Sequence, residues 1–204
     1  MNRGDGNLAE LVDAIRQKSP ELLSLITAQN DAEFEDALDA VIEHALRHLE
    51  KNKKNFRDLD EEGLTAALTG RLSAPGLSVT TEANSNGHVD LTIEVPLSAP
   101  VRQWLGEAKI YDGPSYHCQG LAQLLERYST GRDKSGLMLI YVRKKKIQDL
   151  IAKLRAHMDA QRPCNQTCDT SDHQLAWCFK STHEHSSGNE IAVSHYACNL
   201  YLEQ

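Results

Sequence analysis

The stretch RQWLGEAKIY, residues 102–111, determines how the rest of the chain is interpreted. Trp104 and Ile110 give it the aromatic and β-branched character of a strand. Glu107 and Lys109 lie near its centre, and they point to the same face because side chains alternate along a strand. Burying a carboxylate and an ammonium together is costly. This pair therefore predicts a functional site on a central strand.

A second carboxylate is expected beside this strand. Residues 88–95 are predicted to form a strand that carries Asp90 near its start, and a loop over residues 96–100 leads from it into residues 102–111. The two strands are then hairpin neighbours, which brings Asp90 and Glu107 together. Taken alone, Asp90 is better explained as a surface carboxylate near a turn.

A third acid comes from a helix expected over residues 61–72, which Pro75 and Gly76 end. In helical projection Glu61 falls near the apolar stripe of this helix, whereas Glu62 falls almost opposite. Glu61 is therefore favoured as the acid that reaches into a site. Either residue alone is equally well explained by its place at a helix N-terminus, where negative charge is favourable.

A helix over residues 115–129 and a strand over residues 136–142 follow. Tyr116, Gln119 and Gln123 recur at spacings of three and four residues, so they share one face of the helix. The strand is a continuous apolar run of the kind that is buried on both faces.

The other elements predict an α/β sheet with helices on its faces, preceded by an acidic helical segment. Residues 1–50 hold four Lys and Arg against eleven Asp and Glu, whereas the rest of the chain holds 18 of each, so we divide the chain into residues 1–50 and 51–204. Further helices are expected over residues 8–16, 20–26, 31–50 (capped by Asp31) and 147–161, further strands over residues 77–83, 173–181 and 190–202, and a turn over residues 84–87.

Length and composition exclude some classes of protein. The 204 residues carry a net charge of −7, with 40% hydrophobic and 25% charged residues, which is ordinary for a globular protein. No run of about 18 apolar residues predicts a membrane span, and the first residues have no apolar signal segment. Five cysteines, an odd number, favour a reducing cytoplasm over a disulfide framework.

The acidic helix, the Asp90 strand, Glu107-Ala-Lys109 and the glutamine-bearing helix follow one another over about residues 58–145. This layout resembles the PD-(D/E)xK nuclease superfamily. The segment that begins at Gln123 is similar to a branch found in restriction and anti-phage defence proteins. One departure is that a valine, not the proline of the motif, precedes Asp90.

The resemblance implies a restriction-endonuclease-like fold, with a mixed central sheet flanked by helices and an N-terminal helical extension. It also implies an endonuclease, dependent on Mg²⁺ or Mn²⁺, that acts on DNA in a prokaryotic defence or restriction system, with RNA not excluded. Asp90, Glu107 and Glu61 would bind the metal, Lys109 would assist the attacking water, and Gln123 would complete the catalytic group. Carboxylate oxygens suit these hard cations.

Substrate contacts are expected from two segments. Gln119 and Tyr116 share the helix face of Gln123. The run RKKK at residues 143–146 would place Arg143, Lys144 and Lys145 against the phosphate backbone. A charge run of this kind is otherwise a solvated strand end.

Two other interpretations stay open. The C-terminal part contains cysteines and histidines that would form a structural zinc site if they met in space; they are Cys164, Cys168, Cys178, Cys198, His173, His183, His185 and His195. Alternatively, the chain is a catalytically silent module that binds nucleic acid or a partner protein. Residues 1–50 are in either case expected to contact a second copy of the chain or a sensor protein.

Overall fold

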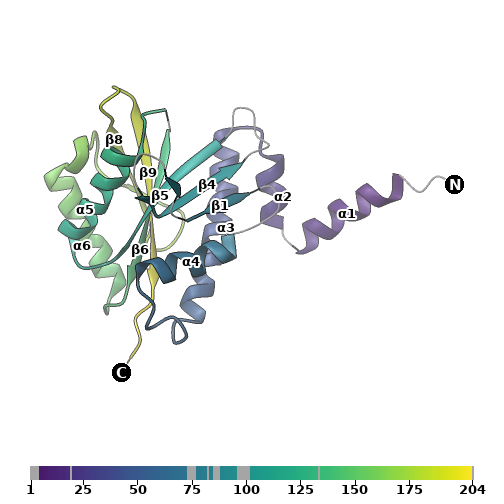
Figure 1. The fold of residues 1–204 in the computed structure, drawn as a ribbon, viewed down its shortest axis with the longest axis horizontal. Coiled ribbons are helices and arrows are strands. Elements are labelled where there is room, and N and C mark those ends of the chain that lie inside the picture. The colour runs from purple at the N-terminus through teal and green to yellow at the C-terminus, as the bar shows by residue number, and fades with distance from the viewer. Residues whose placement is uncertain are drawn as a thin grey trace.

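The computed structural model of the chain describes residues 5–18, 20–72, 77–81, 83–84, 88–95, 102–132 and 134–203. Within these residues the chain forms a seven-stranded mixed sheet with helices on both faces (Figure 1). This confirms the α/β class expected from the sequence. The expectations for residues 75–76, 85–87 and 96–100 lie outside the described residues.

The sheet has the strand order β1-β4-β5-β6-β9-β8-β7. The central strands β5, β6 and β9 are parallel to one another, and the strands on both sides of them are antiparallel to their neighbours. The strand bounds are β1 Ser78–Thr80, β4 Leu91–Val95, β5 Arg102–Ile110, β6 Ser135–Val142, β7 Ser171–Asp172, β8 Phe179–Glu184 and β9 Glu190–Asn199, and the short strands β2 Ala83–Asn84 and β3 His88–Val89 form a separate pair.

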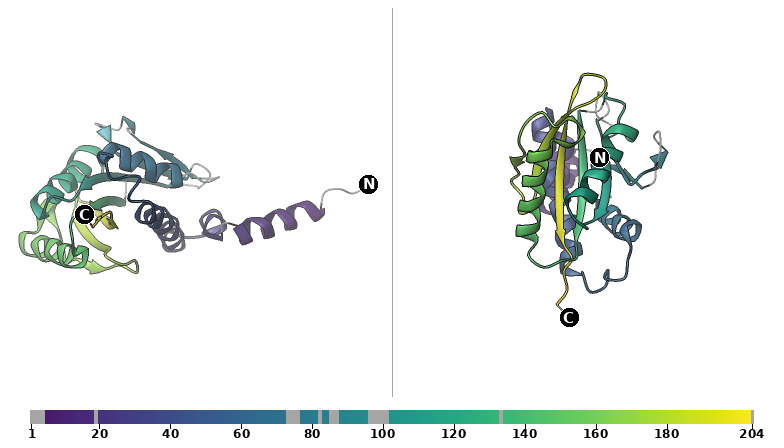
Figure 2. Two further views of the ribbon diagram at one scale, coloured as in Figure 1. Left: turned by 90° about the horizontal axis from the view of Figure 1, so that it is seen from below. Right: turned by 90° about the vertical axis from the view of Figure 1, so that its left-hand side faces the viewer.

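Two hydrophobic cores lie on the two faces of the sheet. Helices α3 (Asp31–Lys51) and α4 (Glu61–Leu72) cover one face, and α5 (Pro114–Ala122) and α6 (Ile147–Gln161) cover the other (Figures 1 and 2). Strand β6 contributes to both, because its alternate residues belong to opposite cores. The prediction that this strand is buried on both faces is confirmed.

Helix α3 is an integral part of the first core. The hydroxyl of Tyr196 on β9 donates to Asp39 Oδ1 over 2.6 Å, which ties the helix to the sheet. The helix is capped by Asn30, whose Oδ1 accepts the Glu33 backbone N–H over 2.9 Å. The prediction that Asp31 is the cap is therefore wrong by one residue, since Asp31 is the first residue of the helix.

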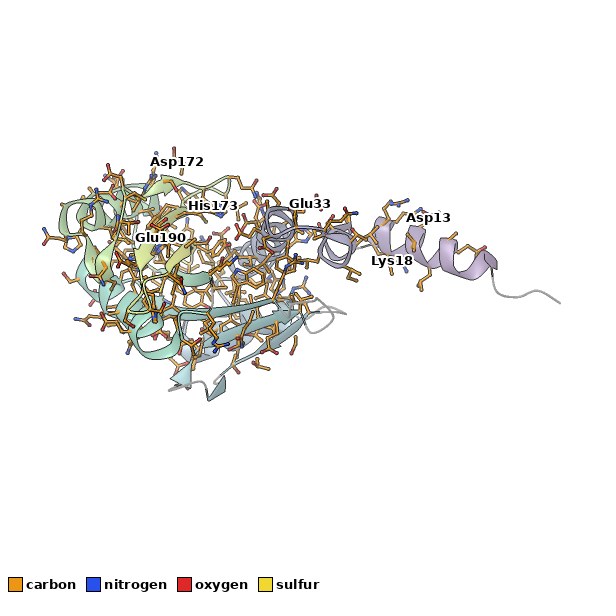
Figure 3. The ribbon with its side chains drawn as sticks, turned by 90° about the horizontal axis from the view of Figure 1, so that it is seen from above. Asp13, Lys18, Glu33, Asp172, His173 and Glu190 are labelled. Carbon is orange, nitrogen blue, oxygen red and sulfur yellow. The ribbon has the colours of Figure 1, made fainter. Side chains whose placement is uncertain are left out.

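The first two helices, α1 (Asp5–Lys18) and α2 (Pro20–Thr27), precede this core. Helix α1 projects away from the body of the molecule, and its residues Asp13 and Lys18 lie far from the sheet (Figures 2 and 3). None of the helices in the described residues combines the length and apolar character that a membrane crossing requires.

Several predicted elements have different bounds in the structure. Residues 77–83 are not one strand, because β1 ends at Thr80 and Ala83 belongs to β2, and the strand predicted over residues 190–202 ends at Asn199. Asp90 forms a bend that separates β3 from β4, so residues 88–95 are not one strand. The α-helical part of residues 115–129 ends at Ala122 and continues as a π-helical turn, η1 (Gln123–Tyr128). The strand predicted over residues 173–181 begins only at Phe179, because residues 173–178 are occupied by a turn in which Cys178 N–H donates to the Leu175 carbonyl.

Candidate active site

The site lies where β5 extends past its neighbour β4. The last paired residues of the two strands are Leu91 and Gly106, so the next backbone N–H groups on that edge of β5 have no strand partner. Two carboxylates accept them: Ala108 N–H donates to Asp90 Oδ2 over 2.9 Å, and Ile110 N–H donates to Glu61 Oε2 over 2.7 Å. An unpaired backbone donor is costly to bury. The hydrogen bonds to these two free N–H groups of β5 therefore fix the positions of Asp90 and Glu61.

The four charged groups predicted from the sequence meet around Lys109. Its Nζ lies 2.6 Å from Glu107 Oε1, 3.2 Å from Glu61 Oε1 and 4.0 Å from Asp90 Oδ2. Helix α4 covers the opposite face of the sheet from α5, so Glu61 reaches this ammonium around the edge of β5. The structure therefore brings together acids from three separate elements.

The four charged side chains of the cluster are buried to different degrees. The side chains of Glu107 and Lys109 are 3% and 10% exposed, whereas those of Glu61 and Asp90 are 28% and 30% exposed. Burial raises the pKa of Glu107 to about 7, with the Asp90 charge adding to the effect, although the Lys109 ammonium opposes it. Burial alone would lower the pKa of Lys109, but the three carboxylates outweigh it and the pKa is raised. Lys109 is therefore charged.

An open cleft gives access to the more exposed acids. It is lined by residues from the start of α4, by Thr81 and by Asp90. Glu61 and Glu62 both border this cleft, but Glu62 is exposed, and only Glu61 contacts β5 and Lys109. The structure thus places Glu61 in the cluster and Glu62 at its rim.

The helix above the cluster approaches it through a glycine. A Cβ atom at Gly120 of α5 would lie 2.9 Å from Lys109 Cγ and 3.0 Å from Lys109 Cε. Such distances are shorter than normal contacts, so only glycine lets the helix lie this close to the lysine stem. Nothing in the sequence singles out Gly120, because a glycine does not reveal which side chain it contacts.

The polar residues predicted on this helix are less closely engaged. Gln123 is half-buried and lies one helical turn after Gly120, at the start of the π-helical turn η1. Gln119 and Tyr116 are exposed. Among the described residues, none of these three side chains forms a hydrogen bond to the carboxylate cluster.

The basic run after β6 divides into different roles. The Arg143 guanidinium donates to the backbone carbonyls of Phe56, over 3.4 Å, and Leu59. Both hydrogen bonds come from Nη2, so this part of the guanidinium holds the loop before α4. A contact of Arg143 with a phosphate backbone stays a prediction. Lys144 and Lys145 are exposed, and Lys144 Nζ lies 2.7 Å from Asp112 Oδ1.

The donor set of the cluster fits a hard divalent cation. Three carboxylates face one ammonium, and Glu107 Oε2 is buried with no hydrogen-bond partner among the described residues. In that part of the chain, no three His, Cys, Asp or Glu side chains stand in metal-binding geometry; the Lys109 ammonium lies among the acids instead. A bound cation would contact the same three carboxylates as the Lys109 ammonium, or it would displace that ammonium from them.

Among the described residues, no three of the cysteines and histidines of the zinc interpretation stand in metal-binding geometry. Cys178 and Cys198 are buried in the core beneath α3, whereas Cys164 packs against the core on the other face of the sheet. The sheet therefore separates these thiols.

Three of the histidines and a serine form a second, buried polar cluster. His183 Nδ1 lies 3.0 Å from the Cys164 carbonyl and must carry a proton to donate to it. Ser181 then donates to His183 Nε2 and accepts from His195 Nε2, both over 2.7 Å, and His117 Nε2 donates to His195 Nδ1 over 3.0 Å. All three rings are neutral in this arrangement.

The buried histidine chain, His117-His195-Ser181-His183, ends at an unsatisfied atom. His117 Nδ1 is buried without a hydrogen-bond partner among the described residues. Burial lowers the pKa of His117 to about 3 and lowers that of His195 well below its ordinary value. The sequence showed His183 and His195 only as zinc candidates and did not single out His117, since nothing in their spacing reveals a row of hydrogen-bonded side chains across α5, β9 and β8.

Comparison of the chain with models of known protein families, with curated proteins and with solved structures finds no match.

Proposed function

We propose that the chain is a nuclease of the PD-(D/E)xK type that hydrolyses phosphodiester bonds with Mg²⁺ or Mn²⁺, acting on DNA as an endonuclease of a prokaryotic defence or restriction system. The observation that carries the proposal is the convergence of Glu61, Asp90 and Glu107 on Lys109 at the open edge of β5. The mixed sheet flanked by helices supports a restriction-endonuclease-like fold. The free state of all five cysteines supports a cytoplasmic location.

Each residue of the cluster would have a separate role in the reaction. Asp90, Glu61 and Glu107 would hold the cation, which when bound supplies a Lewis acid and lowers the pKa of water. Asp90 and Glu61 are held by backbone N–H groups of β5, so they are oriented before a substrate arrives. Lys109 would position the attacking water and offset the charge that develops on the phosphate.

The test is cleavage of plasmid DNA, linear duplex, single-stranded DNA and RNA, each with Mg²⁺, Mn²⁺ or EDTA. Wild type is compared with Glu107→Gln, which removes the buried carboxylate, and with Glu62→Gln, a matched change at the rim of the same cleft. Cleavage that requires metal, is lost in Glu107→Gln and is kept in Glu62→Gln would support the proposal. Equal activity of wild type and Glu107→Gln would refute it.

A second candidate is a catalytically silent binding module. One observation favours it: Asp90 and Glu61 accept backbone N–H groups of β5, and Glu107 Oε1 pairs with Lys109, so these contacts can hold the strand edge together without a cation. In that case Asp90→Ala would leave the biological effect of the protein intact, whereas a nuclease would lose it.

The projecting helix α1 and the helix α2, which packs on α3, are proposed to contact a second copy of the chain or a sensor protein. Leu11 and Ile26 expose more than half of their surface, as expected of residues that a partner would cover. Because α3 belongs to the core, the informative deletion removes residues 1–27 only. Unchanged oligomer size and unchanged activity after this deletion would contradict the proposal.

A further inference from the structure

Two basic segments that are far apart in the sequence meet beyond the end of β6. Residues 51–57, KNKKNFR, contain four basic and no acidic residues, and residues 143–146 are RKKK. Arg143 joins the two segments, because its guanidinium donates to the Phe56 and Leu59 carbonyls. Hydrogen bonds from a charged donor are among the stronger ones in proteins.

Arg143 thereby holds the two lysine-bearing segments next to each other. We define the basic surface as Lys51, Lys53, Lys54, Lys144, Lys145 and Lys146. Five of these side chains are exposed, and Lys53 is half-buried.

Most of this charge is not neutralised by the protein. Lys144 pairs with Asp112, and the Lys145 ammonium lies 5.5 Å from the centre of the Tyr201 ring. For the other four lysines, no carboxylate within 4.0 Å is found in the described part of the chain. Unpaired ammonium groups gathered on one surface attract a polyanion.

The basic surface borders the carboxylate cluster. The segment 51–57 leads within a few residues to Glu61, the first residue of α4. On the other side, Lys144 pairs with Asp112, which lies two residues after Ile110, the residue whose backbone N–H donates to Glu61. A polymer that lies on the lysines therefore reaches the cleft of the acids.

We infer that the basic surface binds the phosphodiester backbone of a nucleic acid and leads it to the carboxylate cluster, with Arg143 as the positioning residue that joins its two halves. The delivery to the cluster rests on the proposed nuclease function, but the binding does not. Contacts to phosphates carry no sequence information, so binding is expected to be unselective for sequence.

An anionic membrane is the less suitable occupant. Surface-bound membrane proteins add apolar side chains to their basic ones. The large apolar residues that are exposed among the described residues are Leu11, Ile26 and Tyr116, and none belongs to the basic surface or to the segments that form it. The surface offers charge without an apolar anchor, which suits a phosphate backbone.

The test measures binding of labelled duplex DNA, single-stranded DNA and RNA in EDTA, which prevents metal-dependent cleavage, over a salt series. The variant Lys54→Glu/Lys146→Glu reverses two lysines that have no ion pair in the structure. We expect at least about a tenfold loss of affinity, and a salt dependence of log K that is about 1.8 units shallower on duplex DNA, or 0.9 for each lost phosphate contact.

The matched control is Lys18→Glu/Lys134→Glu. It makes the same change in net charge at two exposed lysines, one on the projecting helix α1 (Figure 3) and one just before β6, at the far end of that strand from residues 143–146. Equal losses in the two double variants would overturn the inference, as would wild type that binds none of the three nucleic acids. A third outcome would favour a membrane and overturn the inference. In it, wild type binds phosphatidylserine vesicles but no nucleic acid, and Lys54→Glu/Lys146→Glu no longer binds the vesicles.

The binding result is independent of the proposed activity. If Lys54→Glu/Lys146→Glu loses binding while wild type cleaves no substrate, the surface is supported and the nuclease proposal fails. If wild type cleaves and the double variant binds and cleaves as well as the control, the nuclease proposal stands and the surface is refuted. Glu107→Gln, which leaves the basic surface intact, should bind like wild type in either case.

Discussion

Two polar clusters lie on the same face of the sheet. One is built from charged groups, whereas the other is built from neutral rings and a hydroxyl. Glu107 on β5, Met138 on β6 and His195 on β9 stand in one lateral row, because their strands are paired in that register. At the edge of the row, Glu107 meets three other charged groups beside an open cleft. In the interior, His195 belongs to the buried histidine chain, with Phe179 stacked on its ring at 4.2 Å.

The difference follows from the position of each cluster in the sheet. Because β4 begins only at Leu91, the last N–H groups of β5 have no strand partner, and the acids that accept them, Asp90 and Glu61, are partly exposed to water. In the interior no water offsets a buried charge. The rings stay neutral because the hydrogen bonds run one way, from His117 to His195, then to Ser181 and on to His183. Chemistry that needs charge is therefore expected at the edge, and the histidine chain is expected to serve stability. The predictions below test this division.

The largest effect is expected from Lys109→Met. Removing the ammonium should lower the cleavage rate about a thousandfold, since a positioned charge at a developing anion has effects of this order. It should also leave three carboxylates without their cation, so Mg²⁺ should raise the melting temperature of the variant by more than that of wild type. Both effects are measured on the same preparations, by cleavage kinetics and by thermal unfolding with and without Mg²⁺. An unchanged cleavage rate would contradict the assignment of chemistry to the edge.

The next effect concerns acid stability. The folded pKa values of His117 and His195 lie below those of the unfolded chain, so below about pH 6.5 the unfolded state takes up protons that the folded state does not. Stability should therefore be full above that pH and fall as the pH decreases toward the folded pKa, by roughly 2 kcal/mol for each ring at about pH 5. Urea unfolding at neutral and acidic pH measures this loss.

A variant is needed because other groups titrate in the same range. Glu107, with its raised pKa, changes stability in the opposite direction between about pH 4.5 and 7. His117→Leu should have a smaller loss of stability in acid than wild type, whereas His44→Gln, at a side chain that is 71% exposed, should not. If the free energy of unfolding depends on pH in the same way for wild type and His117→Leu, the buried histidine chain is not held neutral.

The sequence predicted the edge cluster but not the histidine chain, and the reason is the range of the contacts. Strand alternation links Glu107 and Lys109, and helical projection separates Glu61 from Glu62, both of which are local rules. The resemblance, not a local rule, implied that Glu61, 48 residues from Lys109, joins the same site. His117 and His195 are 78 residues apart, and Arg143 finds carbonyl partners 84 and 87 residues away. Local periodicity carries no information about such pairs, so Arg143 was interpreted from its charge alone.

A smaller effect on the edge cluster is expected from Gly120→Ala. The new methyl group would meet the Lys109 stem at 2.9 to 3.0 Å and displace it. Misplacing a catalytic group by about 1 Å can lower a rate a hundredfold, so we expect a lower cleavage rate with little change in substrate affinity. The control is Gly70→Ala on α4, where a Cβ meets nothing within 4 Å and alanine should stabilise the helix by up to about 1 kcal/mol. Wild-type kinetics for Gly120→Ala would show that Lys109 tolerates displacement.

The smallest effect is expected from Ser181→Ala, which also tests the division most directly. Loss of the hydroxyl leaves the His195 Nε2–H and the His183 Nε2 lone pair unsatisfied in the interior, at a cost of about 2 kcal/mol in the free energy of unfolding. The matched change Ser186→Ala, in the exposed turn between β8 and β9, should alter this free energy by less than about 0.5 kcal/mol. Met138, an apolar residue, stands between His195 and Glu107 in the row, so no hydrogen bond connects the two clusters through it. Cleavage by folded Ser181→Ala should therefore match wild type. A variant that keeps its stability but loses activity would show instead that the histidine chain takes part in the chemistry at the edge.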